Sequence, residues 1–505
     1  MSLLRGSFSV VIPAAGSATR LRPLTTSMSK AMVPINGKPC IDFILDRVLK
    51  ESNVGKIVIV DGPLDDIRNH VGRRYGDRVT FVKQGELLGP RHAIEVGMNA
   101  VPLDEHVVVW LGDAIILDED VVFGLDFLMT IEAEDQSPWC VWGGLGSRLY
   151  VNKPKSTVPG ARALVGLYSF SSSVAAKNAF TLTTGYDISD ALNAYERMGR
   201  LFHDLPAKEW YDIGEPRTYH ETRAKLLNRK ARAFNTFDYD ADLGLLTKRP
   251  VNPDSAYVNT IIAERKWYEE LTKEQSMFVP RTFPCDHGLS MTFSSGILLS
   301  DLLLYDDIPE STWSYIIRRL VNVVEKYFHS ERMPLERMAS FKADAAIMWI
   351  QKSRWRLNEA DLDQSVVDTL MEFADQLADA ARPVGAIHGD LHLGNVLYDP
   401  QTDRLTLLDP RGRFGDTYGK SGDALYDWAK LAHDMYFGYY ALVANAAPNP
   451  LSRKIFLEVA PKDDINIITK GGLLLIATAI PLHYEDADRQ ERMRRLVIDN
   501  IDGLK

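Results

Sequence analysis

FSVVIPAAGSATRLRPLT, residues Phe8 to Thr25, begins with an apolar run and continues into a series of small residues. The apolar run has the length of one buried strand. Small residues after a strand allow a tight turn in which backbone N–H groups approach phosphate oxygens closely. The stretch therefore predicts a strand that ends in a phosphate-binding turn, and the turn consists of Ala14, Ala15, Gly16, Ser17 and Ala18.

The same alternation of strand and helix patterns continues to about Leu128. Alternating elements of this kind build a mainly parallel sheet with helices on both faces. A doubly wound, Rossmann-like α/β domain is therefore expected. The segments in question are FSVVIPA, CIDFILDRVLKE, KIVIVDG, VTFVKQ, RHAIEVGMNA and HVVVWLGDA.

From Trp139 to Phe237 the pattern is mixed, with strand candidates CVWGG and ALVGLYSFS and a helical DISDALNAYERMG. This stretch is interpreted as the acceptor side of the same domain. A basic helix then leads to TFDYDADLG, which has the composition of a turn before a new strand. The predicted domains are residues 1–237 and 238–505.

The second domain is expected to begin with strand LGLLTK, a helix from about Tyr257 to Leu271 and a strand or connector LSMTFSS. From Leu302 onward the pattern is mostly helical. A small mixed lobe followed by a large helical lobe is typical of a kinase-like (α+β) phosphotransferase.

Composition narrows the class of protein. The chain has 505 residues, 46% of them hydrophobic, and a formal net charge of -10. This negative charge argues against nonspecific binding of nucleic acid, which depends on clustered Lys and Arg. The three cysteines indicate neither a disulfide framework nor a zinc site, so a cytoplasmic protein is expected. No signal peptide is recognised, and the apolar stretch from Gly471 to Leu482 is too short for a membrane helix, so no membrane association is expected.

Arg20 and Lys30 add fixed positive charge after the small-residue turn. In nucleotidyl transfer an acceptor phosphate attacks the α-phosphorus of a nucleoside triphosphate and pyrophosphate leaves. The protein must spread negative charge and keep the reacting atoms in line, and a glycine-containing loop, an arginine and a lysine meet that need.

Further motifs follow in order: SKAMVPINGKP, KQGELLGPRHAI, LGDA, VNKPK, ALVGLYSF, YDISDALNAY and WYDIG. With RLRPLT they resemble the sugar-1-phosphate nucleotidyltransferase family over about Phe8 to Thr222. The family's loop usually has a second glycine where this chain has Ala18. The resemblance implies catalytic roles for Arg20 and Lys30, base recognition by Gln84 and Gly89, a phosphate contact by Lys153, and magnesium ligands at Asp113 and Asp212.

Two aspartates around one Mg²⁺ suit this chemistry, because the ion bridges phosphate oxygens and offsets charge in the transition state. Asp187 and Asp190 of YDISD either face the acceptor or serve as a helix cap and turn.

A second signature lies far downstream, HGDLHLGN at His388 to Asn395, followed by LLD ending at Asp409. Asp390 precedes Asn395 by five positions, and Asp409 ends an apolar strand. In kinases a carboxylate of this kind takes the proton of the acceptor hydroxyl, while an amide oxygen and a second carboxylate hold Mg²⁺ on the nucleotide.

HGDLHLGN and the later GDALYDWAKL resemble the aminoglycoside phosphotransferase and choline kinase superfamily, which modifies small molecules. The resemblance implies Asp390 as catalytic base and Asn395 and Asp409 as magnesium ligands. Lys248 and Glu264 are either the lysine and glutamate that align nucleotide phosphates in kinases or surface charges. MTFSSG, Met291 to Gly296, is a candidate hinge between lobes.

PRGRFGD follows Asp409. Arg411 and Arg413 either grip an acidic group on the acceptor or brace the loop. Trp349 and Trp355 either wall the acceptor site or fill the core of the helical lobe.

These observations favour a bifunctional enzyme in which an ATP-dependent kinase phosphorylates a small hydroxylated acceptor and a nucleotidyltransferase then activates the product. A sugar is the first choice of acceptor, CTP, UTP, GTP or dTTP is the second nucleotide, and the resemblance suggests a bacterial surface polysaccharide such as capsule. One alternative is a choline or amino-alcohol kinase joined to a CTP-dependent cytidylyltransferase. Another is one catalytic domain with a non-catalytic partner domain, and a homo-oligomer is left open.

Overall fold

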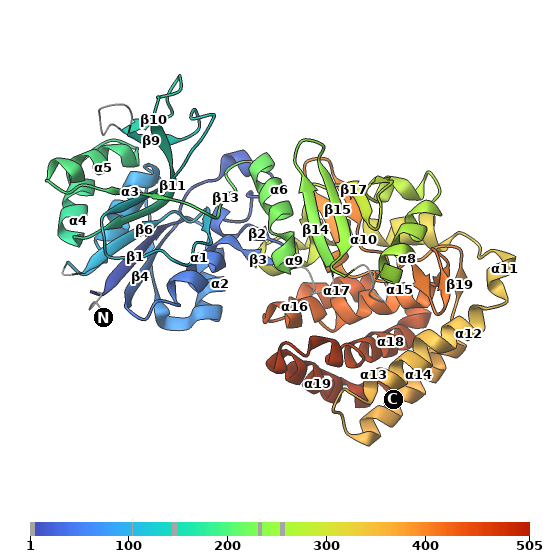
Figure 1. Ribbon diagram of the computed structural model, residues 1–505. Coiled ribbons are helices and arrows are strands. Elements are labelled where there is room, and N and C mark those ends of the chain that lie inside the picture. Colours follow the sequence, from blue (N-terminus) through green and yellow to red (C-terminus); the bar gives the residue numbers. More distant parts are fainter. Residues whose placement is uncertain (1–5, 104, 144–149, 231–234, 253–257) are drawn as a thin grey trace. The chain divides into compact units, whose positions relative to one another are not determined.

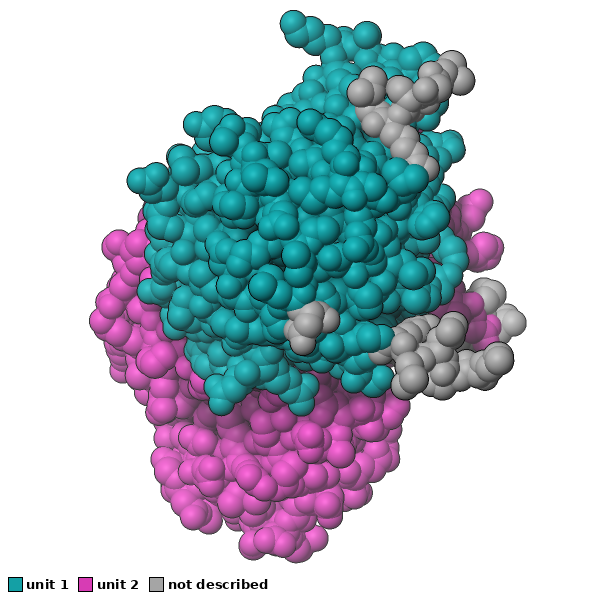
Figure 2. All heavy atoms as spheres, turned by 90° about the vertical axis from the view of Figure 1, so that its left-hand side faces the viewer, with its two compact units in different colours: residues 1–223 teal, residues 224–505 magenta. Residues whose placement is uncertain are grey.

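The computed structural model describes residues 6–103, 105–143, 150–230, 235–252 and 258–505. Contacts between residues divide the chain into two compact units, residues 1–223 and 224–505, coloured separately in Figure 2. The division falls ahead of the boundary expected at Phe237. Phe237 lies in β14 (Asn235–Asp240), which pairs along its whole length with β15 (Leu245–Pro250), so this strand belongs to unit 2.

Unit 1 is built on one nine-stranded sheet (Figure 1). Its central strands are parallel, with Val11 of β1 beside Val58 of β4 and Val109 of β6, whereas β11 runs antiparallel to β6. The order is β10-β9-β11-β6-β1-β4-β5, with β8 beside β11 and β12 beside β8. The strands are β1 (Phe8–Pro13), β4 (Val54–Asp61), β5 (Val79–Lys83), β6 (His106–Trp110), β8 (Phe127–Ile131), β9 (Cys140–Gly143), β10 (Tyr150–Asn152), β11 (Ala161–Phe170) and β12 (His203–Pro206).

Helices cover both faces of this sheet, which confirms the expected Rossmann-like architecture (Figure 1). One face packs against a group of three neighbouring helices, and the core between them includes Val60, Ile94, Phe170, Phe180 and Leu192. The strands form because apolar, mostly β-branched residues are buried on both sides. The helices are α1 (Cys40–Val48), α2 (Asp66–Tyr75), α3 (Gly89–Met98), α4 (Ser173–Leu182) and α5 (Ile188–Arg197), of which α3, α4 and α5 form the group of three.

Two short ladders accompany the large sheet. The strand pair β2 (Pro34–Ile35) and β3 (Lys38–Pro39) is a hairpin, whereas β7 (Ala114–Ile116) and β13 (Trp210–Asp212) join distant parts of the chain. After β13 the chain forms α6 (Pro216–Lys225) and α7 (Leu227–Lys230).

Unit 2 begins with a four-stranded antiparallel sheet, β14-β15-β17-β16, accompanied by α8 (Val258–Glu269). The expectation that TFDYDADLG is a turn is wrong for its first half, because TFDYD lies in β14 and only the following residues turn toward β15. Thr, Phe and Tyr favour strands, and the pairing with β15 outweighs the turn preference of the aspartates. The remaining strands of this sheet are β16 (Thr282–Phe283) and β17 (Leu289–Thr292).

The MTFSSG segment connects β17 to β18, and β18 belongs to a different sheet, β18-β20-β21. It therefore links the small lobe to the large one, as expected for a hinge position. The strands beyond it are β18 (Ile297–Leu298), β19 (Pro383–Val384), β20 (Val396–Asp399), β21 (Arg404–Leu407), β22 (Arg413–Phe414), β23 (Thr417–Tyr418) and β24 (Gly422–Asp423).

The large lobe is helical, which confirms the kinase-like fold class expected for the second half of the chain (Figure 1). Trp349 is 1% exposed and donates through Nε1 to Asp423, so it is a core residue, whereas Trp355 is 62% exposed. The helices are α9 (Leu299–Tyr305), α10 (Glu310–Val323), α11 (Leu335–Met338), α12 (Phe341–Ala346), α13 (Lys352–Leu357), α14 (Gln364–Asp379), α15 (Ala424–Leu431), α16 (Tyr439–Ala444), α17 (Pro450–Val459), α18 (Ile465–Ala477) and α19 (Ala487–Ile501).

The helical segment Lys462–His483 is long and apolar enough to cross a membrane by length and composition, and 67% of its window is buried within the protein. Its central helix, α18, packs against α14, α15 and α19. The apolar composition is thus used for packing inside the helical lobe.

Candidate active sites

The turn after β1 is packed closely against the end of the neighbouring strand β4. Ala14 donates its backbone N–H to Val60, and the backbone of Ala15 lies so near Gly62 that a side chain there would meet the Ala15 carbonyl oxygen at 2.9 Å. Gly16 and Ser17 are exposed beyond this packed base. In the predicted phosphate-binding turn, Ala14 and Ala15 are therefore buried and tightly packed, whereas Gly16 and Ser17 are accessible to solvent.

Ala18 occupies the left-handed region, with φ 45° and ψ 38°. This conformation costs about 1–2 kcal/mol for a residue with a Cβ, and glycine adopts it freely. The Thr25 hydroxyl donates to the Ala18 carbonyl oxygen at 2.8 Å and holds the loop in place. Ala18 therefore has a left-handed backbone conformation that glycine adopts more easily than alanine.

Four predicted residues of unit 1 meet at one cavity: Arg20, Lys30, Asp113 and Asp212. The β7–β13 ladder explains how the aspartates come together, because Asp212 pairs with Ala114, the residue after Asp113. Lys30 forms an ion pair with Asp113, and Arg20 pairs with Glu215 at 2.9 Å. With Glu215 and Asp187, four carboxylates and two cations thus line the same cavity.

The pKa values of the two aspartates move in opposite directions. Burial alone would raise the pKa of Asp113, but the charge and hydrogen bond of Lys30 outweigh burial and hold it below its ordinary value. Burial raises the pKa of Asp212, and the nearby charge of Asp113 adds to this rise while Lys30 opposes it. Two adjacent carboxylates in a partly buried position favour a divalent cation between them.

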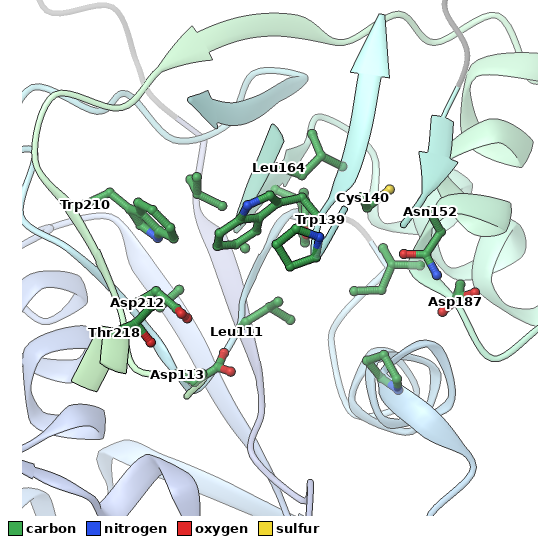
Figure 3. A pocket seen from close by; sticks show the side chains of 18 of the residues that line it. Leu111, Asp113, Trp139, Cys140, Asn152, Leu164, Asp187, Trp210, Asp212 and Thr218 are labelled. Atoms are coloured by element: carbon green, nitrogen blue, oxygen red, sulfur yellow. The ribbon is translucent and has the colours of Figure 1, made fainter. Parts of the chain in front are cut away.

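The cavity has a volume of about 270 Å³, and Figure 3 shows Asp113, Asp212 and Thr218 on one side of it and Asn152 and Asp187 on another. Trp139 and Trp210 form an edge-to-face pair, with ring centroids 5.2 Å apart. Sequence reasoning assigned no role to this aromatic pair.

The residues of the phosphate-binding turn lie outside the lining of this cavity, as do Gln84, Gly89 and Lys153. Gln84 is buried, and its amide contacts the Gly89 carbonyl oxygen at 3.4 Å and His92 Nδ1 at 3.0 Å. Gly89 has φ +86° and begins α3. Lys153 is exposed, and its neighbour Asn152 lines the cavity instead.

Asp187 lines the cavity and makes no side-chain hydrogen bond as the N-cap of α5. This geometry favours the acceptor-facing interpretation over the capping one. Asp190 is exposed in the first turn of α5, and its carboxylate lies beside Gly185.

In unit 2 the three residues expected at the phosphoryl-transfer site are held together by the β20–β21 hairpin. Val396 pairs with Leu407, and the Leu408 N–H donates to the Asn395 carbonyl oxygen at 2.8 Å, so Asn395 and Asp409 flank the open end of the hairpin. The Asn395 amide nitrogen donates to the Asp390 backbone oxygen at 3.0 Å. Asp409 itself has φ 52°.

Lys248, a candidate for the lysine that aligns nucleotide phosphates, contacts this cluster through Asp409. Its Nζ lies 2.8 Å from Glu264 and 3.1 Å from Asp409, and both Lys248 and Glu264 are buried. The surface-charge interpretation therefore does not fit. Burial alone would lower the pKa of Lys248, but Asp409 and Glu264 outweigh it and keep the lysine charged. The arrangement matches the lysine, glutamate and metal aspartate of kinase sites.

Two carboxylates that sequence reasoning did not single out hold the catalytic loop. Asp427 of α15 accepts from the backbone N–H groups of His388 at 2.9 Å and Gly389 at 2.7 Å. Asp434, in the π-helical segment after α15, accepts from the Leu393 N–H at 2.6 Å. The motif GDALYDWAKL contained a signal for Asp427, since it places this carboxylate on a helix that is almost entirely buried, whereas Asp434 lies beyond the motif.

One cation and one imidazole lie beside Asp390, and burial lowers the pKa of the imidazole of His392 to about 4, so that it is neutral. Lys430 lies 2.8 Å from its carboxylate, and His392 lies 3.8 Å away. Burial alone would raise the pKa of Asp390, but Lys430 outweighs it and holds the pKa well below its ordinary value. Arg411 donates its backbone N–H to His388, and its Cβ would nearly touch a side chain at Gly389. Arg413 is exposed.

Both donor sets fit Mg²⁺. Unit 1 offers two carboxylates, and unit 2 offers a carboxylate and an amide, all of them the hard oxygen ligands that this ion prefers. Among the described residues no group of three or more His, Cys, Asp or Glu side chains forms a metal cluster. Mg²⁺ commonly takes its other ligands from substrate phosphates and water, so few protein ligands are required.

Comparisons with known proteins agree with this division. The family model for a MobA-like NTP transferase domain matches residues 10–130, and the model for the phosphotransferase enzyme family matches residues 248–447. Both families are enzymatic.

Relatives of known function match the first half of the chain. A UTP–glucose-1-phosphate uridylyltransferase from Haloferax volcanii is 27% identical over 240 residues, which cover 44% of this chain and 98% of that protein. A low-salt glycan biosynthesis nucleotidyltransferase from the same organism is 28% identical over 44% of this chain and 66% of its own length. A choline-phosphate cytidylyltransferase from Streptococcus pneumoniae is 39% identical over 71 residues, 14% of this chain and 31% of that protein.

The predicted resemblances of both halves are thereby confirmed at the level of the family. The matches coincide with the two phosphate-handling sites: the first includes Asp113, and the second begins at Lys248 and includes Asp409. The chain is therefore a fusion enzyme that joins a MobA-like NTP transferase domain to a domain of the phosphotransferase enzyme family.

Proposed function

We propose that this protein catalyses two successive transfers. Unit 2 moves the γ-phosphoryl group of ATP to a hydroxyl group of a small acceptor, and unit 1 moves a nucleotidyl group from CTP, UTP, GTP or dTTP to the new phosphate with release of pyrophosphate. The observation that carries the proposal is that each unit pairs a lysine with an aspartate, Lys30 with Asp113 and Lys248 with Asp409.

In unit 1 the turn from Ala14 to Ser17 would bind the triphosphate, and Gln84 and Gly89 would recognise the base. Arg20 and Lys30 would offset charge on the phosphates, Lys153 would contact the acceptor phosphate, and Asp113 and Asp212 would hold Mg²⁺. Bound Mg²⁺ would neutralise the charge that develops on the phosphates. The ion pair between Lys30 and Asp113 supports this assignment, because it places a cation beside the metal ligand.

In unit 2 Asp390 would accept the proton of the acceptor hydroxyl. Asn395 and Asp409 would hold Mg²⁺, and Lys248, fixed by Glu264, would align the nucleotide phosphates. The two carboxylates Asp427 and Asp434 act as positioning residues, since they hold the backbone of the catalytic loop.

A sugar is the proposed acceptor. The sugar-phosphate nucleotidyltransferase and the glycan biosynthesis nucleotidyltransferase among the relatives support it. A nucleotide-activated sugar would serve as a cytoplasmic precursor of a surface polysaccharide such as capsule. The kinase reaction comes first in this scheme, because it creates the phosphate that unit 1 uses.

A choline or amino-alcohol acceptor is the second candidate. The match to a choline-phosphate cytidylyltransferase favours it, as does the Trp139 and Trp210 pair, which lines the same cavity as Asp187. Aromatic faces with nearby acidic groups suit a quaternary ammonium ion.

A coupled assay tests the proposal. The full chain is incubated with ATP, Mg²⁺ and a panel of sugars and amino alcohols, and each nucleoside triphosphate is then added in turn while ADP and pyrophosphate are measured. Asp390→Asn should abolish ADP formation but spare pyrophosphate release from pre-made sugar phosphate. Asp113→Asn should show the reverse pattern, and exposed Asp135→Asn is the matched control.

Unchanged pyrophosphate release in Asp113→Asn would show that the unit 1 site is assigned wrongly. Turnover of choline without turnover of any sugar would favour the second candidate. Loss of both reactions in Asp113→Asn alone would point to a regulatory coupling that the proposal does not contain.

A further inference from the structure

Positive side chains from three separate elements converge beside Asp390. Lys430 comes from α15, Lys352 begins α13, and Arg411 follows the metal-site strand. Tyr426 lies between them: its hydroxyl accepts from Lys352 Nζ at 3.0 Å, and its ring lies 5.5 Å from that nitrogen and 5.9 Å from the Arg411 guanidinium. Because Tyr426 is fully buried, it fixes the spacing of the two cations.

This group has more positive than negative charge. Asp390 is paired with Lys430 at 2.8 Å, which leaves Lys352 and Arg411 facing a phenol and an aromatic ring. Arg411 Nε is buried and has no hydrogen-bond partner among the described residues. Burial, followed by the charges of Arg411, Arg356 and Lys430, lowers the pKa of Lys352 well below its ordinary value. Mutual repulsion of this kind is relieved when an anion binds among the cations.

In the proposed function the nucleotide phosphates have a separate cation, Lys248. Lys248 contacts Asp409, and the proposed Mg²⁺ ligands Asn395 and Asp409 flank the same hairpin end. Lys352 and Arg411 instead lie near Asp390, the proposed base that takes the proton of the acceptor hydroxyl. The excess positive charge therefore lies where the acceptor would bind.

We propose that Lys352 and Arg411 bind an anionic group on the kinase acceptor, so that the substrate of unit 2 is a hydroxylated acid or phosphate ester. This inference rests on the kinase assignment and names the substrate class of that site. Of the two roles considered for Arg411, the inference selects binding of the acceptor over bracing of the loop. A cationic acceptor such as choline is disfavoured, since the guanidinium of Arg411 would repel it.

The chemical step is an ordinary phosphoryl transfer. The acceptor hydroxyl oxygen forms a bond to the γ-phosphorus of ATP, the bond from that phosphorus to the bridging oxygen breaks, and ADP leaves. Asp390 takes the hydroxyl proton. The anionic group stays unchanged, held by Lys352 and Arg411 while the hydroxyl faces Asp390.

Acceptor preference tests the inference. The full chain with ATP and Mg²⁺ is offered matched pairs that differ only in charge: glucose and glucuronate, glucosamine and its O-lactyl acid, glycerol and glycerate, with choline as the cationic member. Binding of each compound in the presence of ADP and Mg²⁺ is measured separately by calorimetry. We expect the anionic member to have the higher kcat/KM and the lower Kd by about 10-fold or more, as charge-assisted hydrogen bonds provide.

Variants identify the residues responsible. Lys352→Met and Arg411→Gln should each raise KM and Kd for the anionic acceptor by about 10- to 100-fold while KM for ATP changes little. Arg413→Gln, in the same loop but exposed, is the matched control and should leave both constants unchanged. Lys352→Arg should restore most of the affinity, which separates charge recognition from loss of folding.

The outcomes separate this inference from the kinase assignment. Equal or better binding of neutral or cationic members, or no binding of any anionic member at 10 mM, overturns the inference. Anion binding that depends on Lys352 and Arg411, without ADP formation from any acceptor, would instead overturn the kinase function and leave the anion site standing.

Discussion

The two phosphate-handling centres share a lysine that contacts an aspartate but differ in what holds the lysine. In unit 2 Lys248 lies between Glu264 and Asp409, and its side chain is only 8% exposed. In unit 1 Lys30, whose side chain is 16% exposed, contacts Asp113, whose side chain is 32% exposed, and the nearby Asp212 interacts with this pair through charge. Both partners of the Lys248–Glu264 pair are thus buried, whereas the Lys30–Asp113 pair has one partly exposed partner.

The largest expected effect tests this difference through stability. Lys248→Met leaves Glu264 buried without a cation, and removal of one partner from a buried pair costs about 3–5 kcal/mol. Lys30→Met removes a partly exposed pair, which is worth about 1 kcal/mol or less. Calorimetric unfolding of the full chain should therefore show a much larger fall for the transition of unit 2.

Each variant should also lower the reaction of its own unit by about 100-fold, as is typical when one charge-stabilising donor is lost. Lys266→Met, exposed on the same helix as Glu264, is the control for loss of a lysine. Equal destabilisation by Lys30→Met and Lys248→Met would contradict the contrast drawn between the two centres.

A smaller effect concerns pH. Burial raises the pKa of Asp212, whereas Lys248 lowers the pKa of Asp409 and Lys430 outweighs burial to lower that of Asp390. A protonated carboxyl group does not bind Mg²⁺, so transferase activity at limiting Mg²⁺ should decline at a higher pH than kinase activity as the solution is acidified. Parallel pH profiles of the two reactions measure this.

Saturating Mg²⁺ should move the acid limb of the transferase profile to lower pH, because the ion competes with the proton for Asp212. The control is the kinase profile in the same buffers. Acid limbs that coincide at limiting Mg²⁺ would show that Asp212 is not the group that limits metal binding.

The smallest expected effect concerns the phosphate-binding turn of unit 1. Ala18→Gly removes the cost of a left-handed alanine, and after the greater chain entropy of unfolded glycine is subtracted the gain is about 0.5–1 kcal/mol. The melting temperature of unit 1 should rise by about 1–4 °C, while unit 2 is unaffected. Gly16→Ala is the control, because a Cβ at Gly16 meets no atom within 4 Å. A lower melting temperature in Ala18→Gly would mean that the loop is not strained.

The sequence predicted the elements whose signal is local. Apolar runs such as that of β1 and the motif of HGDLHLGN contain their own pattern, and the structure has the expected strands and catalytic loop there. The strand in TFDYD was missed because its pairing with β15 depends on residues outside the segment.

The parts of the sites that sequence reasoning missed depend on contacts between distant residues. Asp427 reaches a loop 38 residues upstream, and this hydrogen bond exists only after α15 is packed into the lobe. The Trp139 and Trp210 contact depends in the same way on the strands that bring the two rings together. No periodicity or spacing in the chain predicts such pairs.

The β7–β13 ladder affects which positions of unit 1 can be substituted without separating Asp113 from Asp212. Three residue pairs suffice to bring Asp113 next to Asp212, and the chain between them supplies cavity walls such as Trp139, Asn152 and Asp187. The two proposed metal ligands are therefore held together by a ladder that is separate from the residues lining the rest of the cavity. Substitutions confined to cavity-facing positions such as Asn152 and Asp187 would change the acceptor pocket without moving the two aspartates.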